Sequence, residues 1–412
     1  MRIALVNTSY PPYTVGGAER SVSELAHALA HEGHTVMVAA LGPEDGTASR
    51  ELDDDVTVVR IASRAFRPFA SGGKNESRLG KLFWHAGELA RVAEYRSLRR
   101  VLGDFAPDVV HTNNLAGFGW LGWRAARNWP IVHTMRDYYL SCMASNHWRN
   151  GRPCPPTALA CRVSKAPLRH ATVRPDLFVG VSDDIVERHR EYGTIRPSER
   201  AETIHNQPVL SEPNVARVAS GEKFVFGILG RIGSDKGTWL AIEAFLLLAQ
   251  RSQRPVELRL AGSGTPSDVR WIVDLASRRD DIVYVGPADP SEFYATVDCA
   301  LVPTQWPEPF GRTAAEALAV GTPLIASRTG GLPEVTERYG GSFQLVGEFH
   351  SAEAWADAMA SAVSPLPERE AAGFVDVPRA HLVPDEPIHR RYLASYRSAM
   401  VRAGHARSER RS

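Results

Sequence analysis

One strand, turn and helix in the C-terminal half constrain the fold more than any other feature of the chain. The apolar run 299–303 predicts a buried strand, and Pro307, Pro309 and Gly311 predict a turn after it. From Thr313 onward the sequence is rich in Ala and Leu, which predicts a helix. A strand that passes through a short turn into a helix is the repeating unit of α/β folds.

This turn brings free backbone N–H groups to the start of a helix, where the helix dipole favours an anion. The amides of Phe310, Gly311 and Arg312 are therefore expected to bind a phosphate. Glu308 precedes this anion site and Glu316 lies within the first turns of the helix. The spacing alone is common on solvated helix faces. Beside a phosphate site, however, one carboxylate suits the hydroxyls of a transferred sugar, the role we assign to Glu308, and the other suits the ribose of a nucleotide.

A second turn of the same kind lies earlier in this half of the chain. It covers residues 230–237, between a strand predicted over 224–229 and a helix predicted over 238–248. Arg231 and Lys236 lie in this turn. Each alone would be an ordinary surface charge, but a planar guanidinium fork and a compact ammonium on a Gly-rich turn together suit a diphosphate.

The N-terminus begins with the same order of elements. A strand over 3–6, a helix over 21–31 and a strand over 35–40 predict a doubly wound α/β unit. Gly16 and Gly17 in the connecting turn would let backbone amides approach a phosphate, although a purely structural turn also needs glycine. The G-x-G-x-x-G pattern of dinucleotide sites is absent, so such a cofactor is not supported.

Length and the restart of the pattern predict two domains. The chain has 412 residues, more than one ordinary core. We assign the parts as an N-terminal Rossmann-like domain over 1–206, a linker over 207–222, a C-terminal Rossmann-like domain over 223–380, and a final segment over 381–412 with a helix and a basic tail.

Composition and charge exclude several classes of protein. A hydrophobic content of 43% and a charged content of 23% are typical of soluble globular proteins. The formal net charge of +1 predicts no binding to nucleic acid. No apolar run reaches the roughly 18 residues of a spanning helix, and the apolar run 3–6 is too short for a signal peptide. We therefore expect a cytoplasmic protein.

The segment 64–100 is basic and aromatic. It carries nine Lys and Arg residues against three Glu residues, with Phe, Trp and Tyr between them. Such a stretch can lie on an anionic membrane surface. It is equally typical of a solvated helix whose aromatic side chains face the core.

The motifs around the two carboxylates resemble those of a known family. They are E-x7-E with Pro-Phe-Gly inside it, then Gly-Thr-Pro-Leu-Ile-Ala from Gly321 and Gly-Gly-Leu-Pro-Glu from Gly330. In this order they are similar to the retaining nucleotide-sugar glycosyltransferases of family 4, and the resemblance is strong over 230–334 and weaker before 207. It implies two Rossmann-like domains facing across a cleft, the GT-B arrangement, with the final helix packed back near the first domain.

The resemblance also implies the reaction. The family moves a sugar from a nucleoside-diphosphate sugar to a glycan, glycolipid or small-molecule acceptor with retention of anomeric configuration, here in polysaccharide or cell-envelope glycan synthesis. Arg231 and Lys236 match its second phosphate clamp, and Gly16 and Gly17 match a loop near the donor phosphates. Lipid-linked acceptors are frequent in the family, which favours peripheral membrane contact at the inner membrane face through 64–100.

Two histidines at predicted strand ends are further candidates. Ligands gather at the carboxyl ends of strands in open α/β sheets, which points to His111 and His133, although a lone strand-end histidine is more often structural. The segment from His133 resembles the family segment that closes over the reacting sugar, so we assign His133 to catalysis. Many relatives have His-Asp where this chain has Arg136-Asp137. Whether His133 or this pair does the work stays open, and we assign the pair to the acceptor side.

No metal or other cofactor is expected. The Asp run 53–55 lies in a polar connection before a strand and not where a metal motif would be useful. Cys142, Cys154 and Cys161 share one irregular stretch, but eleven and six residues separate them, so no zinc-type Cys pair exists.

Two alternatives to a transferase remain at this point. One is a non-catalytic sugar- or nucleotide-binding protein with two α/β domains. The other is a sugar-nucleotide epimerase of the same layout, which would not be expected to carry the Arg231–Lys236 clamp together with the Glu308–Glu316 pair.

Overall fold

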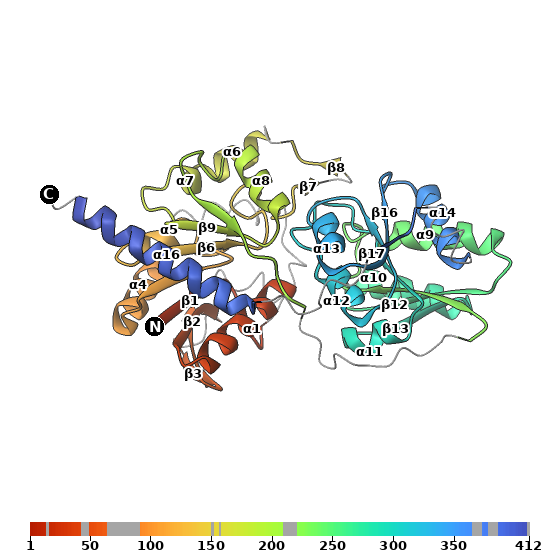
Figure 1. The fold of residues 1–412 in the computed structure, drawn as a ribbon, viewed down its shortest axis with the longest axis horizontal. Coiled ribbons are helices and arrows are strands. Elements are labelled where there is room, and N and C mark those ends of the chain that lie inside the picture. Colours follow the sequence, from red (N-terminus) through yellow and green to blue (C-terminus); the bar gives the residue numbers. More distant parts are fainter. Residues whose placement is uncertain are drawn as a thin grey trace. The chain divides into compact units, whose positions relative to one another are not determined.

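The computed structural model describes residues 1–13, 16–42, 49–63, 91–149, 152–155, 158–208, 221–364, 373–377 and 386–409. The chain forms two compact units (Figure 1). Unit 1 comprises Met1–His147, Cys154–Asn206 and Glu386–Ser412, and unit 2 comprises Trp148–Pro153 and Gln207–Asp385. The predicted first domain, 1–206, differs from unit 1 at the short piece Trp148–Pro153, which belongs to unit 2.

Unit 1 is built on an eight-stranded sheet in the order β10-β9-β6-β5-β1-β2-β4-β3. All neighbours are parallel except β3 and β4, which form an antiparallel edge hairpin. The strands are β1 (Arg2–Val6), β2 (Thr35–Gly42), β3 (Ser49–Asp53), β4 (Val56–Ala62), β5 (Val109–Thr112), β6 (Ile131–Met135), β9 (Leu177–Gly180) and β10 (Ala201–Thr203). Most of the parallel strands are apolar because helices cover both faces of such a sheet, and the exception is the edge strand β10 with the sequence Ala-Glu-Thr.

Two amphipathic helices, α1 (Gly17–His31) and α4 (Val92–Phe105), pack against the sheet of unit 1. α1 buries Val22, Leu25, Ala26 and Leu29 along one face, the predicted stripe at helical spacing. The helices are α1 (Gly17–His31), α4 (Val92–Phe105), α5 (Leu121–Ala125), α6 (Leu159–Ser164), α7 (Ala166–Arg169), α8 (Asp183–Glu191) and α16 (Ile388–Glu409).

The last helix, α16, joins the core of unit 1. It packs against α1 and β6 (Figure 1), and Tyr392 and Tyr396 are fully buried. The phenol of Tyr396 lies 2.7 Å from His111 Nδ1, and Thr134 Oγ1 donates to the Tyr392 phenol at 3.3 Å. These buried polar bonds fix the register of the helix on the sheet.

Unit 2 has a seven-stranded sheet in the order β13-β12-β11-β14-β15-β16-β17, parallel except for β17. Its strands are β11 (Phe224–Leu229), β12 (Val256–Ala261), β13 (Ile282–Gly286), β14 (Cys299–Val302), β15 (Leu324–Ser327), β16 (Gly341–Val346) and β17 (Val375–Val377). Its helices are α9 (Thr238–Arg251), α10 (Pro266–Ser277), α11 (Pro290–Ala295), α12 (Arg312–Val320), α13 (Leu332–Tyr339) and α14 (Ala352–Val363). A two-stranded ribbon, β7 (Trp148–Arg149) and β8 (Arg152–Pro153), also belongs to this unit.

The predicted fold class is confirmed, because each unit is a Rossmann-like α/β domain. Several expected segments fall partly outside the described residues: 64–90 of the basic segment, 209–220 of the linker, 365–372 and 378–380 of the C-terminal domain, and 381–385 and 410–412 of the final segment. The described part of the basic segment enters α4, which buries Leu98, Leu102 and Phe105. No helix in the described ranges is both long enough and apolar enough to cross a bilayer.

Candidate functional site

The centre of the candidate site in unit 2 is an ion pair between two predicted donor-binding residues. Lys236 Nζ lies 2.7 Å from Glu308 Oε1, although 71 residues separate them in the chain. Their side chains are 27% and 12% exposed, and the ammonium also lies 5.4 Å from the centre of the Trp306 ring. Glu308 Oε2 is buried and has no hydrogen-bond donor among the described residues. One oxygen of this carboxylate is therefore unused.

Backbone contacts hold the two loops that carry this pair. Gln305 N donates to Asp235 O at 2.8 Å, and Thr304 Oγ1 donates to the same oxygen at 3.4 Å. Gly237, with φ of +73°, begins α9, and a Cβ there would meet Pro303 O at 1.8 Å. Only glycine allows the two loops to approach this closely.

The loop before α13 supports Glu308 from the other side. Gly331 N donates to Glu308 O at 2.8 Å. A Cβ on Gly330, where φ is +59°, would lie 2.3 Å from Glu308 O. The Gly330-Gly331 pair is therefore required by the local structure, because it lets the loop before α13 pack directly against the backbone of Glu308.

Helix α12 begins as the sequence predicts. Gly311 is its N-cap with φ of +98°, so Arg312 is the first helical residue. Arg312 Nε donates to Glu316 Oε1 at 2.8 Å, and the two side chains are 15% and 4% exposed. Glu316 is therefore held in one orientation by a residue of its own helix.

Tyr294 is a buried residue whose phenol feels the charges of both carboxylates, and it was not singled out from the sequence. Its phenol is fully buried, and burial raises its pKa well above the ordinary value, with the charges of Glu316 and Glu308 adding to the effect. Little in the sequence indicated this residue, because Tyr294 lies in α11 and belongs to none of the motifs described above.

Arg231 lies in the same turn as Lys236 but is more exposed. Its guanidinium pairs with Asp235, and its side chain is 53% exposed. An exposed pair of this kind contributes little to stability. Arg231 can therefore leave Asp235 for a ligand at small cost.

In unit 1, His133 is a buried neutral histidine in the middle of β6, whereas the sequence placed it at the end of a strand. Thr112 Oγ1 lies 2.8 Å from His133 Nδ1, and the ring makes edge contacts with Trp123 and Phe178. Burial lowers the pKa of His133 well below its ordinary value, and neighbouring cations lower it further. A neutral imidazole can exchange a hydrogen bond with a hydroxyl but carries no charge.

His111, in contrast, is occupied by the fold. Its Nδ1 lies 2.7 Å from the Tyr396 phenol and its Nε2 lies 2.7 Å from Thr134 Oγ1. Both ring nitrogens are used inside the core, so His111 is structural.

Arg136 lies just beyond β6 and is 9% exposed. Its Nε donates to Asn113 Oδ1 and its Nη1 donates to Asn206 Oδ1, each at 2.9 Å. Neither asparagine was among the predicted site residues, although Asn113 directly follows β5 and the strand-end rule could have found it.

Of the neighbouring carboxylates, Glu19 is buried and Asp137 is partly buried. Asp137 accepts hydrogen bonds from Tyr139 N at 2.8 Å and from Asn114 Nδ2 at 2.7 Å, and burial raises its pKa to about 6. Glu19 Oε2 accepts from Gly16 N at 2.9 Å, and burial raises the pKa of Glu19.

Gly16 and Gly17 were expected to let backbone amides approach a phosphate, and the structure differs from this expectation in one respect. The amide of Gly16 is already bonded to Glu19, three residues along, at the start of α1. Gly17 is the first residue of this helix. The turn is therefore capped by its own helix through Glu19, and the amide of Gly16 is not directly available to a phosphate.

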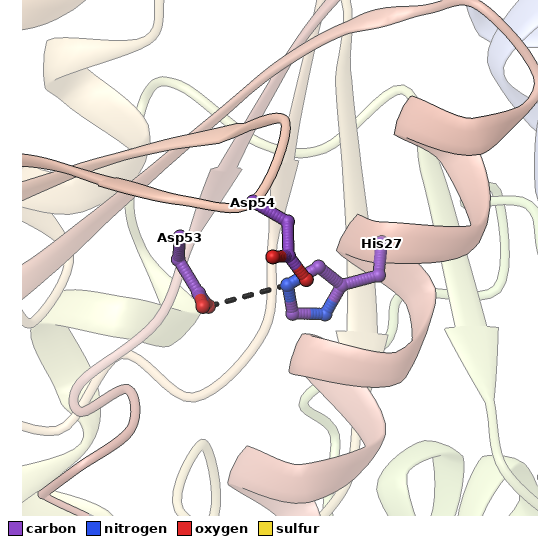
Figure 2. A group of neighbouring side chains, drawn as sticks. All are labelled: His27, Asp53 and Asp54. Atoms are coloured by element: carbon purple, nitrogen blue, oxygen red, sulfur yellow. Dashed lines mark ion pairs between the residues drawn. The ribbon is translucent and has the colours of Figure 1, made fainter.

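The Asp run 53–55 forms part of a hairpin rather than a simple connection. Asp53 ends β3, and Asp54 has a φ of +49° in the turn to β4. Figure 2 shows Asp53, Asp54 and His27 of α1 with their side chains together, and His27 Nε2 lies 3.3 Å from Asp53 Oδ2. The Tyr10 phenol donates to the same oxygen at 3.2 Å. These contacts fasten the edge hairpin to α1, which explains the cluster without an ion.

The three cysteines of the irregular stretch lie in unit 1 as free thiols. Cys142 is buried, and Cys154 and Cys161 are partly exposed. A hydrogen bond from the Cys142 thiol lowers the pKa of Cys161 to about 6.

Comparison with known proteins gives consistent matches over both units. The profile of Glycosyltransferase Family 4 matches residues 15–207, and that of Glycosyl transferases group 1 matches residues 213–373. A protein in the cps region of Klebsiella pneumoniae is 29% identical, covering 82% of this chain and 87% of its own. Glycogen synthase of Mycobacterium tuberculosis is 29% identical over 81% of this chain and 80% of its own. The structure of Anabaena HepE with UDP and glucose matches with a TM-score of 0.58 at 19% identity, over 90% and 92% of the two chains.

Proposed function

The chain belongs to glycosyltransferase family 4, and from this premise we propose that it transfers a sugar from a nucleoside-diphosphate sugar with retention of anomeric configuration. The ion pair between Lys236 and Glu308 carries the proposal, because it brings a phosphate-type cation and a sugar-type carboxylate into contact. The family assignment favours a transferase over a binding protein or an epimerase.

We assign donor binding to unit 2. Lys236 and Arg231 neutralise the diphosphate, together with the amides of Phe310, Gly311 and Arg312 at the start of α12. Glu308 accepts hydrogen bonds from the transferred sugar, and Glu316 accepts them from the ribose. The unused Oε2 of Glu308 supports this role, since a buried carboxylate oxygen needs a donor. Anabaena HepE, a protein of the same fold, binds UDP and glucose.

The proposed chemistry requires no metal and no separate base. The bond between the anomeric carbon and the phosphate oxygen breaks while the acceptor oxygen bonds to that carbon. The acceptor proton passes to the departing phosphate oxygen. Arg231, Lys236 and the amides stabilise the charge on the leaving diphosphate. His133 exchanges a hydrogen bond with a hydroxyl of the transferred sugar as a neutral imidazole.

We assign acceptor binding to unit 1, with Arg136 and Asp137 as its polar contacts. The acceptor is a glycan, glycolipid or small molecule, and the process is polysaccharide or cell-envelope glycan synthesis at the inner face of the membrane. The relative in the cps region of Klebsiella pneumoniae supports this setting. Membrane contact through 64–100 remains part of the proposal.

Product analysis tests this function. The full chain is incubated with UDP-, GDP- and ADP-sugars, with and without glycan and lipid-linked acceptors, in the presence of EDTA. We expect release of nucleoside diphosphate that depends on acceptor, and a product with the donor's anomeric configuration by NMR. Isomerised sugar without diphosphate release would indicate an epimerase, and binding without turnover would indicate a binding protein.

A further inference from the structure

Arg136 is a buried cation whose described partners are all neutral. Its side chain is 9% exposed, and its two hydrogen bonds end on the amide oxygens of Asn113 and Asn206. None of the ion pairs formed by the described residues includes Arg136. A buried charge without a counter-ion is unfavourable, so this arrangement is costly in the free protein.

The nearby carboxylates do not form an ion pair with Arg136. Glu19 uses its oxygens to accept from Gly16 N at 2.9 Å and from Ser9 Oγ at 3.4 Å, and no oxygen of Glu19 comes within ion-pair distance of Arg136 in the part of the chain described. Asp137 accepts from a backbone amide and from Asn114. Both carboxylates therefore accept hydrogen bonds from neutral donors, and although the charges of Glu19 and Arg136 attract each other, neither carboxylate pairs directly with the guanidinium.

The same place also holds unused hydrogen-bond donors. Asn113 Nδ2 is buried without an acceptor among the described residues, and the amide it belongs to is fixed because its oxygen holds Arg136 Nε. Arg136 Nη2 makes no hydrogen bond to a described residue, while Nε and Nη1 are held in place. A fixed guanidinium with a free N–H edge matches the oxygens of a carboxylate or a phosphate.

We propose that Arg136 and Asn113 form a subsite for an anionic group, a carboxylate or a phosphate ester, on the sugar substrate that unit 1 binds. This rests on the proposed function and gives it a substrate class: a hexuronate or a phosphorylated sugar rather than a neutral one. A bound anion forms an ion pair with the guanidinium of Arg136, whereas a neutral sugar leaves the guanidinium without an ion-pair partner.

Three monosaccharides test this subsite and distinguish the sources of the anion. D-Glucose, D-glucuronate and D-glucose 6-phosphate differ mainly at carbon 6, and their binding to the full chain is measured by NMR titration at equal ionic strength. We expect the wild type to bind at least one anionic sugar about tenfold or more tightly than D-glucose, on the scale of a charge-assisted hydrogen bond. Preference for glucuronate identifies a carboxylate, and preference for the phosphate identifies a phosphate ester.

Two variants and a control separate a ligand role from a structural one. Asn113→Asp is nearly isosteric and gives Arg136 an internal counter-ion, so it should abolish the preference for anions and raise the unfolding temperature. Arg136→Gln should abolish the preference as well. Arg127→Gln, on an exposed arginine of the same unit, should leave it unchanged.

Equal binding of the three sugars by the wild type would overturn the proposal, and so would a preference that survives in Asn113→Asp. Failure of the proposed function would look different. It would appear as no acceptor-dependent release of nucleoside diphosphate by the wild type in the product analysis, whereas failure of the subsite alone leaves that release intact and removes only the preference among sugars.

Discussion

Replacing Glu308 by glutamine tests the proposed donor site most directly, because it removes one charge and keeps the size of the side chain. Over the 2.7 Å between Lys236 Nζ and Glu308 Oε1, Coulomb attraction is about 1.5 kcal/mol in water and about 6 kcal/mol at an effective dielectric of about 20. The side chains are 27% and 12% exposed, so desolvation offsets much of the larger value. A net attraction of about 1–3 kcal/mol is therefore expected to hold Lys236 away from a ligand.

This attraction makes the nucleoside diphosphate and the complete donor respond differently. A diphosphate must take Lys236 from Glu308, so Glu308→Gln should raise its affinity by about fivefold to about a hundredfold, the equivalent of about 1–3 kcal/mol. The nucleotide sugar also donates hydroxyls to Glu308, and each hydrogen bond to a charged group contributes about 1.5–3 kcal/mol. Its affinity should fall about tenfold or more, and turnover should fall at least about a hundredfold.

Calorimetric titration with matched diphosphates and nucleotide sugars measures the two affinities, and release of diphosphate measures turnover. Glu243→Gln, on the exposed side of α9, is the matched control and should change neither quantity. Lys236→Ala should weaken both ligands and lower turnover at least about a hundredfold. Turnover within a few-fold of wild type in both Lys236→Ala and Glu308→Gln would refute the roles assigned to this pair.

Three further predictions concern other parts of the chain. Glu316→Gln should weaken the diphosphate itself about tenfold by calorimetry, since it removes a charged acceptor for the ribose, and equal affinity would reject that role. Gly330→Ala should lower the free energy of unfolding by about 2 kcal/mol or more, because its Cβ would lie 2.3 Å from Glu308 O, whereas Gly347→Ala, with open space around it, should cost far less in the same denaturant titration. Burial lowers the pKa of His147 from 6.5 to about 3, so between these pH values the unfolded chain binds a proton that the folded chain does not, and stability falls as pH falls below 6.5. His147→Gln should reduce the slope of unfolding free energy between pH 6 and pH 4 by up to about 1.4 kcal/mol per unit, and an unchanged slope would contradict the assignment.

Local patterns predicted most of the parallel strands and their following helices. The runs at β1, β2, β11 and β14 are apolar because both faces of a parallel sheet are covered, and this property is visible in a short window of sequence. The start of α12 was predicted for a similar reason, since Gly311 and the Ala-rich run after it are local signals.

The edge elements carry no such signal. β3 is exposed over four of its five residues and pairs on one side only, so its sequence lacks the alternation of a half-buried strand. The ribbon of β7 and β8 has two residues in each strand. This ribbon belongs to unit 2 because of its tertiary contacts, which a local sequence pattern cannot predict.

Side-chain contacts between residues far apart in the sequence could not be predicted either. The residues of the donor site were found by motif, but the contact between Lys236 and Glu308 follows from two loops that only the folded sheet brings together. The same holds for His111, whose structural role depends on Tyr396, 285 residues later. Asn113 and Asn206 were not identified by any motif. Their importance follows only from the structure, in which their neutral amide oxygens accept the hydrogen bonds of Arg136.

Lys236 and Arg136, two of the cations assigned to substrate binding, are compensated in opposite ways, and this has a consequence for turnover. Lys236 has an internal counter-ion in Glu308, so the empty donor site buries no lone charge. A complete donor satisfies both groups, phosphate on the lysine and hydroxyls on the carboxylate. After transfer, the diphosphate keeps Lys236 but leaves Glu308 without a donor, so recovery of the ion pair favours product release. Arg136 forms no ion pair within the described chain, so it gains a direct counter-ion only while an anionic substrate is bound.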